Sequence, residues 1–378
     1  MLADQRAQFV EIDDEVAYLN TASLSPLLRS VRAAGEAALV QRGRPWTITA
    51  DHWFSDVERL RSSIARLING SPEGVALVPA SSYGLSVAAR NLHAGPGDRV
   101  LVLDQEFPSS YYTWRRFAAR TGSDLVEVDR QPGQRWTDAV LAALDERTAV
   151  VVVPNVHWTN GAWVDLHAVK VRAGDVGAAL VVDASQSLGV VPLDINSLRP
   201  DFLVSVGYKW QLGTVGVSYL YVDERHRSGE PLEENWALRV GADDFAALVD
   251  YQDEYQPGAR RFDMGQRPSF GLVPMAIAAI DHLLAWGVPD IAEALGRVTD
   301  EIAERARALG LAPPARDERG PHMLGLELPP DAMDRAAGAL ARNGVVVSVR
   351  GRSLRIAPHL HTSTADIDRL VDALRTAL

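Results

Sequence analysis

The chain has 378 residues, more than one compact core usually holds, so two domains are expected. Hydrophobic residues make up 47% and charged residues 23%, an ordinary globular composition. The net charge of -11 argues against a general nucleic-acid-binding role. No cysteine is present, which excludes disulfides, thiolate metal sites and cysteine nucleophiles and is compatible with the cytoplasmic location that we expect.

The sequence carries no pattern of membrane insertion or export. Its N-terminus lacks a basic stretch followed by an apolar segment, so no signal peptide is expected. The longest apolar runs, Ala149–Val153 and Ala178–Val182, are far too short to cross a bilayer. We therefore expect neither a membrane nor a nucleic acid among the partners.

From about residue 26 to 255, short apolar strands alternate with helical patterns such as Trp136–Asp145 and Asp165–Gly177. The expected strands are Val75–Val78, Arg99–Asp104, Ala149–Val153, Ala178–Asp183, Phe202–Val206 and Val217–Val222. They are rich in Val, Leu and Ala with little polar alternation, as in strands buried on both faces of a mainly parallel sheet. The pattern predicts a doubly wound α/β domain.

The last third of the chain changes character after a Gly-, Arg- and Pro-rich junction at residues 258–274. A long helix is expected over Val273–Trp286. Strands near residues 323–328, 345–349 and 354–357 then alternate with amphipathic helices, including Ala365–Leu378. We expect an N-terminal segment (1–25), a large domain (26–260), and a bridging helix with a small α+β domain (261–378).

Small hydroxyl residues follow the first predicted strand. Ser81 and Ser82 precede a helix expected over Leu85–Asn91, where free backbone N–H groups and the helix dipole favour an anion such as phosphate. An ordinary serine N-cap is the alternative. Phe107, just past the next strand, could stack on a planar ring or fill the core under a loop.

Two polar residues follow the third predicted strand. Asn155 could hydrogen-bond a ring hydroxyl or a substrate group. His157 has no partner at ligand spacing, and it is read as a wall or structural residue or as a substrate-binding one. His359 and His361 lie two apart without a nearby acid, so no metal site is predicted.

A lysine and an aspartate stand at the ends of the next two strands. Asp183 ends Leu180-Val181-Val182-Asp183, and Lys209 follows Phe202–Val206. Pyridoxal phosphate (PLP) needs this pair, because a lysine amine forms a Schiff base with its aldehyde and an aspartate pairs with its protonated ring nitrogen. Alternatively, both are ordinary polar residues at strand ends.

Arg355 lies on an otherwise apolar strand and therefore needs a partner. A substrate carboxylate matches its planar fork, and an internal salt bridge is the alternative. Neither GxGxxG after the first strands nor GxxxxGK[ST] occurs. The sequence therefore lacks the phosphate-binding motifs of nicotinamide dinucleotide enzymes and of P-loop nucleotide-binding proteins.

Taken in order, these segments resemble the class V aminotransferase family of fold-type I PLP enzymes. That family includes cysteine desulfurases, kynureninases, isopenicillin N epimerase-like proteins and the C–S lyases of thiohistidine biosynthesis. The resemblance covers nearly the whole chain, from Tyr18-Leu19-Asn20-Thr21-Ala22-Ser23 to Leu354-Arg355-Ile356-Ala357-Pro358. Its most specific parts are the segments of Asp183 and Lys209.

The resemblance implies roles for individual residues. Lys209 resembles the Schiff-base lysine that also carries the Cα proton after the external aldimine forms, and Asp183 resembles the pyridinium partner. Around them, Phe107 would stack on the ring, Gln186 would approach the ring oxygen, Ser81, Ser82 and Tyr208 would hold the phosphate, and Arg355 would hold the substrate carboxylate. Ala22, in the N-terminal active-site segment, would also face the substrate.

Two further implications concern assembly and chemistry. The segment near Gln266 would reach the phosphate of a partner subunit, so a homodimer with shared active sites is expected. Desulfurases of this family need a cysteine nucleophile, and this sequence has none, so desulfuration through an enzyme persulfide is excluded. Val206 stands where several relatives have Ser or Thr, which leaves Tyr208 a larger share of the phosphate site.

The sequence thus predicts a PLP-dependent enzyme acting on an amino acid, as an aminotransferase or a β-eliminating lyase of the C–S type. Isopenicillin N epimerase-like or kynureninase-like activity is the alternative. Five aromatic residues could line a roomy substrate pocket or serve ordinary packing: Trp46, Trp53, Tyr111, Trp158 and Trp163. Two hypotheses of other classes stay open, a catalytically silent PLP-fold binding protein and an α/β enzyme that uses a nucleotide.

Overall fold

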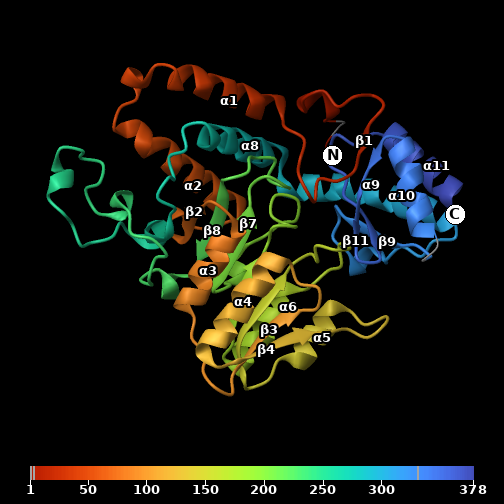
Figure 1. Cartoon of the computed structure of the whole chain (residues 1–378), viewed down its shortest axis with the longest axis horizontal. Helices are drawn as coiled ribbons and strands as arrows, with labels where there is room; N and C mark the ends of the chain where they lie inside the picture. Colours follow the sequence, from red (N-terminus) through yellow and green to blue (C-terminus); the bar gives the residue numbers. More distant parts are fainter. Residues whose placement is uncertain (1, 3–4, 330–331) are drawn as a thin grey trace.

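The computed structural model describes residues 2, 5–329 and 332–378. Its centre is a seven-stranded sheet (Figure 1). The strands, in sheet order, are β2 (Val75–Val78), β8 (Ser218–Val222), β7 (Phe202–Val206), β6 (Ala179–Asp183), β5 (Thr148–Pro154), β3 (Arg99–Leu103) and β4 (Asp124–Val128). Only β8 runs against its neighbours. The doubly wound, mainly parallel sheet that the sequence predicts is therefore confirmed.

Each of the six predicted strands is present to within a residue, and the sheet also contains an unpredicted strand, β4. Strand β4 lies at the sheet edge, pairs only with β3, and has exposed residues at Asp124 and Glu127. An edge strand needs less apolar sequence than a central one, because part of its surface faces water. The search for continuous apolar runs, which identifies the buried strands, therefore does not identify β4.

Helices cover both faces of the sheet because successive side chains along each strand point to opposite sides. On one face, Val150 and Val152 pack with helices α3 (Ser81–Asn91) and α4 (Pro108–Thr121). On the other face, Val151 and Val153 share a larger core with four helices. These are α2 (Ser55–Leu67), α5 (Trp136–Ala143), α6 (Leu166–Val176) and α8 (Leu272–Trp286). Short α7 (Ile195–Leu198) and α1 (Arg29–Arg42) complete this layer.

The C-terminal part forms a second, smaller α+β layer with its own hydrophobic cluster. Its antiparallel sheet has the order β11 (Ser348–Arg350), β12 (Ser353–Ile356), β9 (Leu324–Glu327). Helices α9 (Val288–Ala308), α10 (Ala332–Arg342) and α11 (Thr364–Ala377) pack against it. The sequence-predicted strand near 345–349 is divided between β10 (Val345–Val346) and β11.

The N-terminal segment belongs spatially to this smaller layer (Figure 1). Strand β1 (Ala17–Tyr18) pairs in parallel with β10, and Thr21 N donates to Ala357 O. The segment then turns towards the large sheet, where Ser25 N donates to Tyr208 O at 3.1 Å. It therefore joins the small layer to the loop that carries Lys209.

A buried ion cluster links α2 and β2 to the junction that precedes the C-terminal part of the chain. Asp263, fully buried, accepts hydrogen bonds from Arg61 Nη2 at 2.7 Å, Arg267 Nη1 at 2.6 Å and Leu77 N at 2.8 Å. Both arginines are also buried. The guanidinium groups hold the pKa of Asp263 below its usual value although burial opposes this. Residues of α2, of β2 and of the junction at residues 258–274 are thereby joined at one point.

We expect Asp263→Ala to destabilise the protein by about 3–5 kcal/mol, because it leaves Arg267 buried without a counter-charge and Arg61 with Glu58 alone. Urea unfolding followed by tryptophan fluorescence measures the change. Glu293→Ala is the control, since its pair with Arg297 is on the surface and should shift the midpoint little. Equal shifts in the two variants would refute a structural role for the cluster.

Candidate active site

The parallel strands deliver their following residues to one edge of the sheet. Asp183 ends β6, Lys209 comes three residues after β7, and Phe107 follows β3. Twelve residues line one narrow cleft there: Ser81, Glu106, Phe107, Pro154, Val156, Trp158, Asp183, Ser185, Gln186, Val206, Tyr208 and Lys209. The free space is about 20 Å³, so a planar ring could enter only if side chains such as Lys209 moved.

Lys209 is 7% exposed, and its amine makes no hydrogen bond or ion pair within the described part of the chain. Its Nζ lies 5.4 Å from the centre of the Phe107 ring. Burial lowers the pKa of Lys209 to about 8, although the nearby carboxylate of Asp183 opposes the shift. An amine that loses its proton this readily can act as a nucleophile or base near neutral pH.

Asp183 shares the cleft and is also buried. Its Oδ1 accepts a hydrogen bond from Ser185 N at 2.9 Å, and the Ser185 side chain also hydrogen-bonds the carboxylate. Burial raises the pKa of Asp183, while the Ser185 bonds and Lys209 counteract the rise. A cation next to Oδ2, such as a protonated ring nitrogen, would restore the ionised form.

Aromatic side chains form one wall of the cleft. Phe107 and Trp158 meet edge to face with ring centres 5.5 Å apart. Trp158 Nε1 donates to Gln105 O at 2.6 Å, which fixes the indole over the opening. Of the five aromatic residues that could have formed a roomy pocket, Trp158 alone lines this cleft, and the other four serve packing or surface elsewhere.

Arg355 lies on β12 and is 1% exposed. Its guanidinium donates to Ser348 Oγ, to Trp158 O at 2.7 Å and to Ser23 Oγ at 2.8 Å. No carboxylate pairs with it among the described residues, so the structure does not contain the internal salt bridge considered above. Burial and Arg350 lower the pKa of Arg355 to about 10. A buried arginine with only neutral partners is suited to an incoming anion.

The residues expected to hold a phosphate are only partly brought together. Ser81 opens α3, four residues earlier than the helix expected from sequence, and it lines the cleft with Tyr208. Ser82 lies in the first turn of the same helix outside the cleft lining. Gln266 is exposed on the surface, away from this chain's cleft.

Three other predicted residues are engaged in contacts of their own. Gln186 lines the cleft, but its amide donates to Ala22 O at 3.1 Å and accepts from Trp210 Nε1 at 2.8 Å. Asn155 donates to Val164 O at 2.9 Å. The structure thus uses Gln186 and Ala22 to tie the N-terminal segment to the wall of the cleft.

His157 is not brought to the cleft. Its ring stacks on Trp136 with centres 5.3 Å apart, and Nδ1 lies 2.7 Å from Thr159 Oγ1. It lines a separate cavity of about 450 Å³ together with Arg350 and Arg352. Burial lowers the pKa of His157 to about 4, so the ring is neutral near pH 7. The structure thus matches the reading of His157 as a structural residue better than the substrate-binding one.

Sequence reasoning passed over Glu106 and Ser23. Glu106 lines the cleft beside Asp183, and Ser23 Oγ accepts from Arg355. Only their positions in the sequence could have pointed to them: Glu106 directly precedes Phe107 after a strand, and Ser23 lies in the N-terminal segment. Neither residue stands out by type, because its environment is formed by segments distant in sequence.

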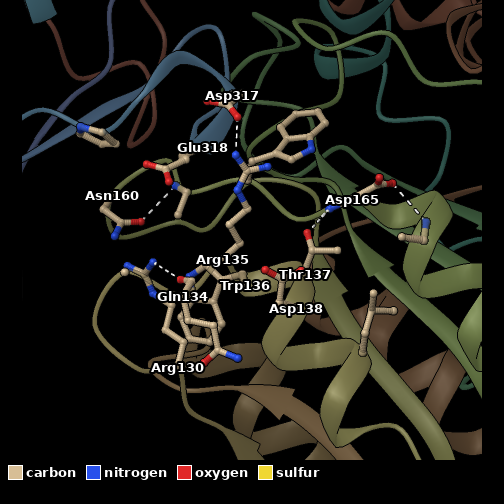
Figure 2. A pocket seen from close by; sticks show the side chains of 16 residues that line it. Arg130, Gln134, Arg135, Trp136, Thr137, Asp138, Asn160, Asp165, Asp317 and Glu318 are labelled. Atoms are coloured by element: carbon tan, nitrogen blue, oxygen red, sulfur yellow. Dashed lines mark hydrogen bonds and ion pairs between the residues drawn. The ribbon is translucent and has the colours of Figure 1, made fainter.

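A cavity of about 480 Å³ lies elsewhere, between α5, the start of α6 and residues 314–318 of the small layer (Figure 2). Arg135 crosses it to pair with Asp317, and Asp165 N bonds Thr137 Oγ1 at 3.0 Å. Trp163 lines this cavity, but none of the residues predicted to bind cofactor or substrate does. This cavity therefore lies at the junction between the two layers, away from the residues proposed to carry the chemistry.

The described residues include no group of three His, Cys, Asp or Glu side chains that could hold a metal ion. His359 and His361 are fully buried, and burial lowers the pKa of both. In the same part of the chain no single helix has the length and apolar composition to span a membrane; α8 and α9 meet that test only as a pair bent by 79°.

Comparison with known proteins places the chain in a family. The model of the class V aminotransferases matches residues 37–365, so the chain belongs to that family. It is 28% identical to isopenicillin N epimerase of Streptomyces clavuligerus over 96% of this chain and 95% of the relative. It is 27% identical to the uncharacterized aminotransferase YcbU of Bacillus subtilis (strain 168), over 85% of each.

Solved structures confirm fold type I. A mutant of C-DES with glycine covalently linked to its PLP cofactor superposes with a TM-score of 0.90 at 19% identity over 100% of both chains. Cysteine desulfurase from Thermococcus onnurineus NA1 gives 0.85 at 19% identity, over 99% of this chain and 98% of that one. The family thus implies PLP, and the cleft offers a lysine, a strand-end acid, a stacking ring and a helix N-terminus that fit it.

Lys209 should react with PLP as a group of pKa about 8. Below that pH the protonated amine is inert, so the fraction of protein trapped by borohydride at short times should rise with pH and reach half its maximum near 8 rather than 10.5. Peptide mapping reports the labelled site.

The sequence offers a strict control, because Lys170 is its only other lysine. Lys170 lies 3.6 Å from Asp201 and outside the cleft. Lys170→Arg should leave the labelling profile unchanged, whereas Lys209→Ala should remove it. Labelling that survives in the Lys209 variant would contradict the assignment.

Proposed function

We propose that the chain is a PLP-dependent enzyme that acts on an amino acid and ends in amino-group transfer or in loss of a β leaving group, as in C–S lyases. The observation that carries this is one buried cleft in which an unpaired Lys209 faces Asp183, with an uncompensated Arg355 at its border. Structural ion pairs need neither a buried lysine held without an ion pair nor a buried arginine with only neutral partners.

The roles follow from the contacts. Bound PLP supplies a sink for the electrons left when a Cα proton departs. Lys209 would hold the cofactor and then take that proton, which its pKa of about 8 permits. Asp183 would keep the ring nitrogen protonated, and Phe107 would support the ring face. Arg355 would hold the α-carboxylate and so fix which Cα bond stands near Lys209.

The remaining predicted contacts are part of the same proposal. Ser81 and Tyr208 would bind the phosphate from within the cleft, with Ser82 as a further donor from the first turn of α3. Gln186 and Asn155 would approach the ring oxygen only after exchanging their present partners. Ala22 would face the substrate through the backbone that also holds Gln186.

The choice among reactions rests on what surrounds Cα. An enzyme persulfide is excluded because the sequence has no cysteine. Epimerisation needs a second proton carrier on the opposite face of Cα, a role that the proposal assigns to no residue, so epimerisation stands behind transfer and β-elimination as an alternative. Kynureninase-like cleavage remains the alternative supported by the Phe107 and Arg355 segments. A catalytically silent binding protein would not need the low pKa of Lys209.

We further propose a homodimer whose partner supplies Gln266 to the neighbouring phosphate site. The support is that Gln266 is exposed and that large apolar side chains elsewhere on the chain project into solvent, among them Leu39 of α1 (72% exposed), Val249 (77%) and Tyr251 (94%). Exposed apolar patches are commonly interfaces. A cytoplasmic location and the segment boundaries at residues 25 and 260 stay predictions.

The function is tested by incubating the PLP-loaded protein with a panel of amino acids. Products are scored as keto acid, released β-group and Cα-deuterium exchange. Lys209→Ala should reduce all three by about a thousand-fold or more, the range of general-base effects. Turnover in that variant close to wild type, or no product from any amino acid, would overturn the proposal.

Arg355→Ala should raise KM for carboxylate substrates by about 10- to 100-fold, as expected for loss of a charged hydrogen-bonded pair. PLP affinity should change far less, because no cofactor contact is assigned to Arg355. The neighbouring Arg352→Ala, an exposed residue, is the matched control. Parallel loss of PLP and substrate binding in Arg355→Ala would make Arg355 a structural residue.

A further inference from the structure

Glu106 is a buried acid in the cleft to which the proposed function gives no role. It sits in the turn between β3 and α4, where Glu106 N donates to Leu103 O at 3.2 Å. The preceding residue, Gln105, has φ of +54°, a conformation that costs free energy for a non-glycine residue. Strain of this kind is kept where the surrounding structure requires a particular placement.

The two carboxyl oxygens of Glu106 have different surroundings. Oε1 accepts a hydrogen bond from Phe107 N at 2.8 Å, at the start of α4. Oε2 is buried and has no hydrogen-bond partner in the described structure. The residue is 8% exposed and pairs with no cation there. A buried acceptor without a partner is costly unless a ligand or a proton satisfies it.

The cleft contains a second carboxyl group, Asp183, and one amine, Lys209. Tyr208 is the other titratable side chain that lines it. Two carboxylates in a closed apolar space repel each other, and a single cation cannot compensate both. Burial first, and then the charge of Asp183, raises the pKa of Glu106 to about 8. The pair is therefore most stable with one proton, held by Glu106.

We propose that Glu106 is a protonated positioning residue of the cofactor cleft, which anchors the Phe107 backbone through Oε1 and offers an O–H donor into the cleft through Oε2. The role at the cofactor rests on the proposed function, but the protonation does not. A neutral Glu106 leaves Asp183 as the single anion at the ring-nitrogen end. It also keeps the Phe107 ring in place for stacking, because the backbone N–H of Phe107 is held by the same side chain.

Glu106→Gln is the decisive variant, because glutamine reproduces an acceptor oxygen and a donor group without a charge. It should bind PLP within about 2-fold of the wild type and leave the pH titration of the bound cofactor's absorbance unchanged. Glu106→Ala loses both contacts and should weaken PLP binding by about 10-fold or more. Weakening by Glu106→Gln as large as by Glu106→Ala would overturn the neutral assignment.

A second readout is independent of the cofactor. Infrared spectra recorded at pH 7 and compared as wild type minus Glu106→Gln should contain the carbonyl stretch of a protonated carboxyl group that the variant removes. Glu127→Gln, an exposed acid on β4, is the control and should leave that band in place. Absence of the band in a protein that binds PLP on Lys209 would refute this inference alone; its presence in a protein that binds no PLP would refute only the proposed function.

Discussion

The direction of the strands is the constraint on which the site depends. Strands β2, β3, β5, β6 and β7 all run the same way, so the residues that follow them meet at one edge of the sheet. Ser81, Phe107, Asp183 and Lys209 are separated by up to 128 positions in sequence yet line one cleft. Ligand sites of open α/β sheets form at this edge because no strand continues there to fill it.

Burial of charge without a counter-charge is the second organising feature. Asp263 shows how this fold treats a structural charge, since Arg61 and Arg267 surround it and the backbone N–H of Leu77 is a further donor. Arg355 is also buried but receives only neutral partners, and Lys209 is buried near the carboxylate of Asp183 without a hydrogen bond or ion pair in the described part of the chain. The proposed function accounts for this contrast, because it assigns a ligand to each of the two cations.

Strand and helix existence followed from local sequence because buried strands and amphipathic helices have periodic signatures. The edge strand β4 lacks that signature and was not predicted. The start of α3 was predicted too late, at Leu85 instead of Ser81, because small polar residues occur equally in a loop and in a first helical turn. The direction in which each side chain points was harder to predict from the sequence. The Trp136 ring that holds His157 and the Trp210 indole that engages Gln186 both come from other segments, so position after a strand predicted proximity to the site but not direction.

The N-terminal segment connects the surroundings of Arg355 with the cleft that contains Lys209. Within four residues, Ala22 O binds the Gln186 amide, Ser23 Oγ binds Arg355, and Ser25 N binds the carbonyl of Tyr208. Strand β1 ties the same segment to β10 of the small layer. The segment therefore links Arg355 and the Tyr208–Lys209 loop through one short run of hydrogen bonds. Under the proposed function, this link would set the position of the substrate carboxylate relative to Lys209, which is how remote binding energy can serve the chemical step.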